Sequence, residues 1–286
     1  MSDTMCPTPL VARAVAPARV LALHCSGSSG TQWRQLQRTL GSDYDLVAPD
    51  LLQLDGNNAL RVGEGLSLER EAEWLIQRLD SSDAPVHILG HSYGGAVALR
   101  LAQMQPERIA SLALYEPSIF ALLREMGEYG RLAAQEIQLL STRIGRLVHD
   151  GLCQAAAEEF VCYWGDQFAW TKLRPNQQQE LTQQMPLVVQ HFRALQESSV
   201  CLADLQHRPV PTLILRGGHS PTPARLISCH LLAHLPNAKG ACFGEVGHMG
   251  PVTHADVVAS RIAGFIDACA AHCRTKNAKT ARSVAA

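Results

Sequence analysis

The chain has almost no net charge and no long hydrophobic run. Its 25 Lys and Arg residues balance 26 Asp and Glu residues, which argues against nucleic acid or another polyanion as a partner. No apolar run approaches the ~20 residues of a membrane-spanning helix, and the first residues lack the basic and apolar regions of a secretion signal. We therefore expect a small-molecule substrate, neither a nucleic-acid nor a membrane partner, and leave a homodimer open.

Regular cysteine and ligand patterns are also missing. The nine cysteines form no C-x-x-C pair and no regular framework. Several, such as Cys162 and Cys201, fall in apolar surroundings, so we interpret them as reduced core thiols of a cytoplasmic protein. The sequence contains no metal-ligand cluster and no dinucleotide fingerprint, and the glycine loop at 27–30 is too short and has no lysine to bind phosphates. We expect no cofactor and no metal.

The most informative stretch is Gly90–Gly95, which contains G-x-S-x-G around Ser92. An apolar run precedes it at 85–89 and a small-residue helical pattern follows at 96–102. The order strand, G-x-S-x-G, helix is that of a nucleophile elbow, whereas the motif without its flanks would be weak. Gly90 and Gly94 leave room for the tight turn, and Gly95 lets the helix approach the sheet. The flanks favour a nucleophilic Ser92 at the C-terminal edge of a parallel sheet.

Strand and helix patterns alternate along most of the chain. Apolar runs predict strands over 19–24, 44–50, 85–89, 109–115, 210–217 and 240–243, with helices between them. This alternation predicts an α/β fold with a doubly wound, mostly parallel sheet.

The alternation stops between 118 and 206, where the patterns are helical and the scarce aromatic residues concentrate. Because ligands bind at the carboxyl ends of strands in such sheets, we interpret 118–206 as a helical cap inserted into a core formed by 1–117 and 207–272. A separate helical domain is the alternative. Breaks are expected at Gly165 and Pro175, and the basic segment 273–286 is expected to be a disordered tail.

Four motifs follow one another in a recognisable order: His24-x-x-Gly27, the Gly90–Gly95 turn, a Leu-Ile-Leu-Arg-Gly strand end at 213–217, and Gly247-His248. With this set, the chain resembles the α/β-hydrolase superfamily between Arg19 and Cys269. The resemblance implies the α/β-hydrolase fold and a catalytic triad in the chain order Ser, Asp or Glu, His. The first two strands common in the family are poorly represented, which predicts a sheet that is short at that edge.

A serine hydroxyl needs a base to remove its proton, and the base needs an acid to orient it. His248, in a glycine-rich loop before the last helix, is the predicted base, with His254 as its rival. The usual acid position, in the loop after 213–217, holds Ser220, which cannot carry the charge. Some family members place the acid after the strand that follows the elbow, which here is Glu116. We therefore predict Ser92, Glu116 and His248 as the catalytic residues; weaker alternatives for the acid are Asp204 and Glu245.

The resemblance also implies an oxyanion hole of two backbone N–H groups, which we assign to Tyr93 and Ser26. Cys25 stands where the family usually has Gly. Aromatic residues of 118–206 are candidate walls of the substrate pocket: Trp164, Phe168, Trp170 and Phe192, with Tyr129 as a further candidate.

Serine as nucleophile suits acyl transfer, whereas family members that attack saturated carbon use Asp. We therefore expect a serine hydrolase that cleaves a small or medium apolar carboxylic ester. One alternative is a carbon–carbon bond hydrolase of ring-cleavage products. The other is a non-catalytic, ligand-binding member of the fold, which would be expected to show a damaged triad or oxyanion loop.

Overall fold

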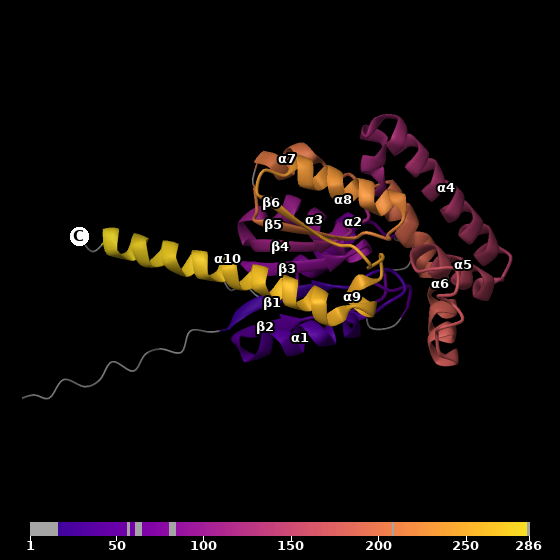
Figure 1. The fold of residues 1–286 in the computed structure, drawn as a ribbon, viewed down its shortest axis with the longest axis horizontal. Coiled ribbons are helices and arrows are strands. Elements are labelled where there is room, and N and C mark those ends of the chain that lie inside the picture. Colours follow the sequence, from indigo (N-terminus) through magenta and orange to yellow (C-terminus); the bar gives the residue numbers. More distant parts are fainter. Residues whose placement is uncertain (1–16, 56–57, 61–64, 80–83, 208, 285–286) are drawn as a thin grey trace, which may run out of the picture.

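Six parallel strands form the central sheet of the computed structural model (Figure 1), in the order β2-β1-β3-β4-β5-β6. The structure describes residues 17–55, 58–60, 65–79, 84–207 and 209–284. The strands are β1 (Ala18–Leu23), β2 (Tyr44–Val47), β3 (Val86–His91), β4 (Ile109–Tyr115), β5 (Thr212–Gly217) and β6 (Ala238–Phe243). This is the predicted doubly wound parallel sheet.

Helices cover both faces of this sheet (Figure 1). One face packs against α1 (Arg34–Leu40) and α10 (Ala255–Val284), and the other against α2 (Leu68–Ile76), α3 (Tyr93–Met104) and α8 (Thr222–His234). Successive strand residues alternate between the two layers: Leu112 and Leu114 join the α2–α3 side, whereas Ala113 and Tyr115 join the α1–α10 side. Burial on both faces explains the continuous apolar runs of these strands.

Between β4 and β5 the chain forms only helices within the described ranges. They are the 3-10 helix η4 (Phe120–Glu125), α4 (Gly127–His149), α5 (Cys153–Trp164), α6 (Pro175–Gln196) and α7 (Leu202–His207). As expected, α5 ends at Gly165, and Pro175 occupies the first position of α6. We call residues 118–206 the helical insertion.

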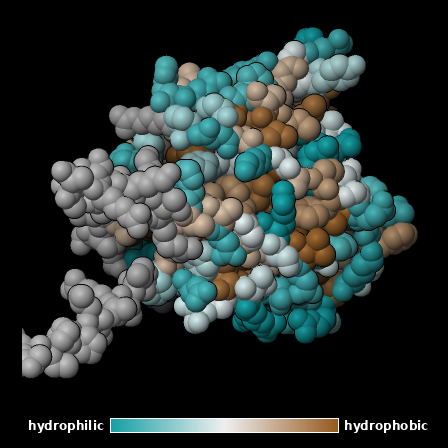
Figure 2. Space-filling view, turned by 60° about the vertical axis from the view of Figure 1, so that its left-hand side comes forward, coloured by the Kyte–Doolittle hydropathy of each residue, from teal (hydrophilic) through white to brown (hydrophobic). Residues whose placement is uncertain are grey.

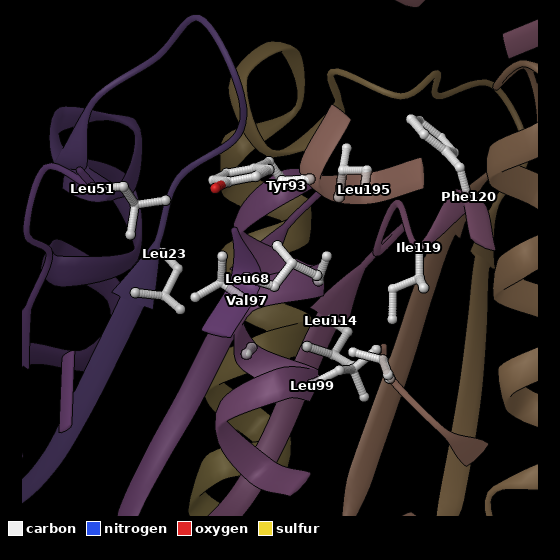
Figure 3. Packing of buried hydrophobic residues seen from close by; sticks show 14 of the residues in the cluster. Leu23, Leu51, Leu68, Tyr93, Val97, Leu99, Leu114, Ile119, Phe120 and Leu195 are labelled. Carbon is white, nitrogen blue, oxygen red and sulfur yellow. The ribbon is translucent and has the colours of Figure 1, made fainter. Parts of the chain in front are cut away.

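The insertion shares one hydrophobic cluster with the sheet. Figure 3 shows Phe120 and Leu195 of the insertion in the same cluster as Leu23 and Leu114 of the strands. Because this apolar cluster is continuous across both parts, the insertion packs on the core rather than standing apart from it.

Two expectations are wrong. The segment after 272 is not a tail of irregular backbone, because α10 continues to Val284; its Ala, Lys and Arg residues are strong helix formers and no Gly or Pro interrupts them. The cysteines are not generally core thiols either: Cys25 is buried, whereas Cys201, Cys229 and Cys242 are exposed. Apolar neighbours in sequence do not decide which face of an element a side chain occupies.

Figure 2 shows hydrophobic patches interspersed with hydrophilic residues on one face of the molecule. Among the described residues, no helix is both long and apolar enough to cross a membrane.

The glycines of the elbow have a direct steric test. A Cβ atom on Gly94 would lie 2.4 Å from the Leu23 carbonyl oxygen and 2.5 Å from that of His24. We expect Gly94→Ala to lower the free energy of unfolding by about 3 kcal/mol, because rigid backbone must move. The matched control is Gly145→Ala in α4, where a Cβ meets nothing within 4 Å and which we expect to stabilise by ~0.5–1 kcal/mol. Urea denaturation measures both, and equal effects would contradict the steric argument.

Candidate active site

Ser92 occupies a strained turn between β3 and α3. Its φ of 54° and ψ of −114° lie outside the regions that non-glycine residues favour. Backbone hydrogen bonds hold this geometry: the Ser92 N–H donates to the Tyr115 carbonyl (3.0 Å), and the Ser92 carbonyl accepts from Ser118 N–H (3.1 Å). The turn is therefore fixed by the neighbouring strand β4 and the residues after it.

The glycines around Ser92 allow this turn. A Cβ on Gly90 would approach the Gly94 carbonyl oxygen to 2.4 Å, and one on Gly95 would lie 2.9 Å from Pro117. The predicted role of Gly90 is confirmed, because it relieves crowding inside the turn. Gly95 differs from its prediction, because its close contact is with the loop after β4.

Glu116 and His248 form a buried pair at the strand ends. The Glu116 carboxylate accepts a 2.6 Å hydrogen bond from His248 Nδ1 through Oε2 and a 2.7 Å bond from the Gly217 N–H through Oε1. Its backbone φ is 45°, the second positive value of a non-glycine residue in the described chain. The alternative acids lie elsewhere: Asp204 bonds Gln103, and Glu245 is almost fully exposed.

The loop that carries His248 is held by two further side chains. Tyr115 donates its hydroxyl to the Gly247 carbonyl (2.8 Å), and His91 Nε2 donates to the His248 carbonyl (2.8 Å). Burial, and then the proximity of His248, lowers the pKa of His91 well below its usual value, so this ring stays neutral and acts as a donor. His254, the rival base, is exposed and bonds Thr253.

The Ser92 hydroxyl bonds Ser118 in this structure, at 3.1 Å. The Ser118 hydroxyl donates to the Glu116 carbonyl (3.3 Å), which leaves its oxygen to accept the Ser92 proton. The two buried hydroxyls and the carboxylate–imidazole pair thus occupy one small region. Ser220, at the usual acid position, is buried with no hydrogen-bond partner for its hydroxyl among the described residues.

The loop after β1 is fixed at Cys25. His24 donates from Nδ1 to the Cys25 carbonyl (2.8 Å) and accepts from Leu51 N–H at Nε2 (3.0 Å), while Gln32 Oε1 accepts the Cys25 N–H (3.3 Å). The next N–H along the chain is that of Ser26. Tyr93 N–H, at the first position of α3, has no intrahelical acceptor, as is usual in the first turn of a helix.

Glu71 lies buried beneath the elbow. It accepts hydrogen bonds from the Tyr93 hydroxyl (3.1 Å) and the Leu52 N–H (3.2 Å). Burial raises the pKa of Glu71 to about 8, and these two hydrogen bonds only partly counter that effect.

A cavity of about 710 Å³ opens between the core and the insertion. Ser92 and His248 line it, and so do Ser26 and Gln32 of the loop after β1. The insertion contributes apolar side chains to its walls: Phe120, Phe160, Trp164, Phe192 and Leu195. Other lining residues are polar: Ser28, Thr31, Asp166, Lys172, Gln177, Glu180 and Gln184. Gln32 Nε2 is buried without a hydrogen-bond partner among the described residues.

The structure separates the predicted pocket aromatics. Trp164 lines the cavity with its ring 4.3 Å from that of His248, and Phe192 lines it beside Phe120. Phe168 does not line it and is 59% exposed, because it lies in the turn between α5 and α6. Tyr129 is 78% exposed on the outer face of α4. Trp170 is buried and does not line the cavity.

Three polar residues near the site escaped the sequence analysis: Glu71, Ser118 and His191. Glu71 had a detectable signal, because it shares the inward face of α2 with Leu68, Ala72 and Leu75. His191 contacts Ser26, 165 positions away in the chain, and no local pattern marks such a pair. Within the described ranges, no three His, Cys, Asp or Glu side chains group as metal ligands.

The pKa of Glu71 leads to a stability prediction. Its usual value is 4.5, so the folded chain binds a proton that the unfolded chain has lost between about pH 4.5 and 8. Because of Glu71, the free energy of unfolding therefore falls as pH rises through that range, by up to about 1.4 kcal/mol per pH unit. We expect Glu71→Gln, whose Oε1 can accept the Leu52 N–H and whose Nε2 can donate to the Tyr93 hydroxyl, to stabilise the protein at pH 8.5 relative to wild type and much less at pH 5.

Urea denaturation at both pH values measures the difference. The exposed Glu158→Gln is the control and should show none. A Glu71→Gln effect that is equal at pH 5 and 8.5 would contradict a buried, proton-binding carboxyl.

Comparisons with known proteins agree with this architecture. A model of the alpha/beta hydrolase family matches residues 20–261. The lipase LipV of Mycobacterium tuberculosis is 36% identical over 104 residues, which cover 36% of this chain and 38% of the lipase. The 2-hydroxymuconate semialdehyde hydrolase of Pseudomonas putida is 25% identical over 232 residues, 77% of this chain and 76% of that protein.

Among solved structures, MenH from S. aureus has a TM-score of 0.71 at 20% identity, over 90% of this chain and 96% of that chain, which shows a shared fold. The match covers little more than a third of the length of the lipase, so this relative alone does not establish the family of the whole chain. The family model, by contrast, spans the sheet, the elbow and the His248 loop. The chain therefore belongs to the alpha/beta hydrolase family.

Proposed function

We propose that this protein is a serine hydrolase that cleaves small or medium apolar carboxylic esters through an acyl-enzyme. The observation that carries the proposal is the Glu116–His248 hydrogen bond of 2.6 Å, together with the position of His248 and the strained Ser92 in the lining of one cavity. Family membership supports hydrolase activity in general, and the arrangement of these residues supports acyl transfer in particular.

The three residues have separate roles. Glu116 accepts a hydrogen bond from the Nδ1–H of His248, which leaves Nε2 as the base, and its charge stabilises the imidazolium that forms. The Ser92 hydroxyl turns from Ser118 toward Nε2, gives up its proton and attacks the ester carbonyl. His248 then returns the proton to the leaving alcohol. Water repeats these steps on the acyl-enzyme and releases the acid.

Negative charge that develops on the carbonyl oxygen requires preorganised donors. The Ser26 and Tyr93 N–H groups supply them, and the first turn of α3 adds the positive end of the helix dipole. Within the cavity, the aromatic wall of Trp164 and Phe192 favours an apolar acyl group, since apolar contact yields about 0.8 kcal/mol per buried CH₂. The insertion serves as the cap that keeps water from this wall.

The direct test is hydrolysis of p-nitrophenyl butyrate and labelling by a fluorophosphonate. We expect wild type to turn over the ester and to carry the label on the peptide that contains Ser92, and Ser92→Ala to lose both. Glu116→Gln should lower kcat by about 10³-fold or more, because the imidazole loses its orientation and its charge partner. If the kcat of Glu116→Gln lay within a few-fold of wild type, Glu116 would not be the acid of the triad.

Acyl specificity tests the cavity wall. Phe192→Ala removes a ring from the cavity, so we expect kcat/KM for p-nitrophenyl octanoate to rise about 10-fold relative to butyrate. Phe168→Ala is the matched control, because this ring is 59% exposed and outside the cavity lining; its preference should equal that of wild type. A changed preference between octanoate and butyrate in Phe168→Ala would indicate that the acyl group binds outside this cavity.

Carbon–carbon bond hydrolysis is the second candidate. The match to 2-hydroxymuconate semialdehyde hydrolase extends over most of both chains, which favours keeping it. Turnover of a dienone acid by a protein that leaves short esters intact would select this reaction over ester hydrolysis.

A further inference from the structure

His191 belongs to helix α6 of the insertion, but its side chain contacts the core. Its Nδ1 lies 2.9 Å from the Ser26 hydroxyl, and its ring stacks on the Tyr93 ring with centroids 3.8 Å apart and planes 21° apart. The residue is buried, and it does not line the cavity. One side chain therefore contacts both residues whose N–H groups form the proposed oxyanion hole.

These two residues lie on separate elements. Ser26 follows β1 in a loop, and Tyr93 begins α3. The loop is anchored from the core side at Cys25, through His24 and Gln32, while the phenol of Tyr93 is anchored by Glu71. Each of these hydrogen bonds fixes either the loop that carries Ser26 or the side chain of Tyr93. His191 is the side chain that spans Ser26 and Tyr93.

The spacing between the two N–H groups matters because each donor must lie within about 2.7–3.1 Å of the oxygen that becomes negative. We propose that His191 is a positioning residue that fixes Ser26 relative to Tyr93 and so assembles the oxyanion hole from the insertion side. This inference rests on the proposed hydrolase function and adds a named residue to it.

His191 fulfils this role as a neutral ring. Burial, and then the proximity of His24, lowers the pKa of His191 to about 3, so it brings no charge to the developing oxyanion. Its contribution is geometric, through one hydrogen bond and one stacked face. Correct spacing of the two donors stabilises the transition state more than the bound ester, because the carbonyl oxygen of the bound ester carries less negative charge.

Three variants separate positioning from packing. His191→Leu removes the hydrogen bond and the stacked ring but keeps apolar volume. His191→Asn places an amide near the position of Nδ1 and can restore the bond to Ser26. Val188→Ala is the control: this residue is equally buried on α6, is absent from the cavity lining and makes none of these contacts.

The experiment measures kcat and KM for p-nitrophenyl butyrate, and inhibition by phenylboronic acid, whose adduct with serine places an oxyanion in the hole. We expect His191→Leu to lower kcat about 10- to 100-fold with KM within three-fold, and to weaken boronate inhibition by a similar factor. His191→Asn should recover most of the lost kcat, and Val188→Ala should keep kcat within two-fold even where it lowers Tm.

The failure of this inference is distinguishable from that of the proposed function. If wild type hydrolyses the ester but His191→Leu retains its kcat, the positioning role is wrong and the hydrolase proposal stands. The same conclusion follows if Val188→Ala loses as much kcat as His191→Leu, or if boronate affinity is unchanged. A wild type that neither hydrolyses esters nor takes the fluorophosphonate label at Ser92 overturns both.

Discussion

The buried carboxylate of Glu116 is the interaction on which the site depends. It ends β4, accepts the Gly217 N–H at the end of β5, and accepts His248 Nδ1 from the last loop. A carboxylate without such partners would be costly to bury, because removal from water strongly disfavours the charged form. Two short hydrogen bonds offset that cost, and they also fix where the imidazole lies. Burial of the acid and alignment of the base are therefore one structural feature.

The strain in the site is concentrated at two neighbouring strand ends. Ser92 after β3 and Glu116 after β4 have φ values of 54° and 45°, in a region that costs non-glycine residues of order 1–3 kcal/mol. The same few bonds stabilise both: Ser92 N–H to the Tyr115 carbonyl, Ser118 N–H to the Ser92 carbonyl, and Glu116 N–H to the Leu215 carbonyl. The parallel ladder thus places Ser92 and Glu116, the proposed nucleophile and acid, side by side after β3 and β4.

Features with a local cause were predictable from the sequence. Strand β4 has the predicted bounds because a sheet buried on both faces requires an uninterrupted apolar run, and Glu116 followed from a serine at the usual acid position. Features that depend on tertiary partners were not. Phe168 and Trp164 are four positions apart and equally aromatic, yet one lies in an exposed turn and the other against His248. Nothing local distinguishes them, just as nothing local pairs His191 with Ser26.

The insertion therefore combines two kinds of position. At Trp164 and His191 it contacts residues of the proposed catalytic centre, the ring of His248 and the hydroxyl of Ser26. At Gln177, Glu180 and Gln184 it lines the polar part of the cavity, where we propose that it contacts the substrate. We expect substitutions at Gln177, Glu180 or Gln184 to alter which alcohol or acid is accepted and to leave the geometry of the proposed oxyanion hole intact. Substitutions at Trp164 or His191 should change rate and specificity together, because the helices that form the cavity wall also hold the proposed reacting groups in place.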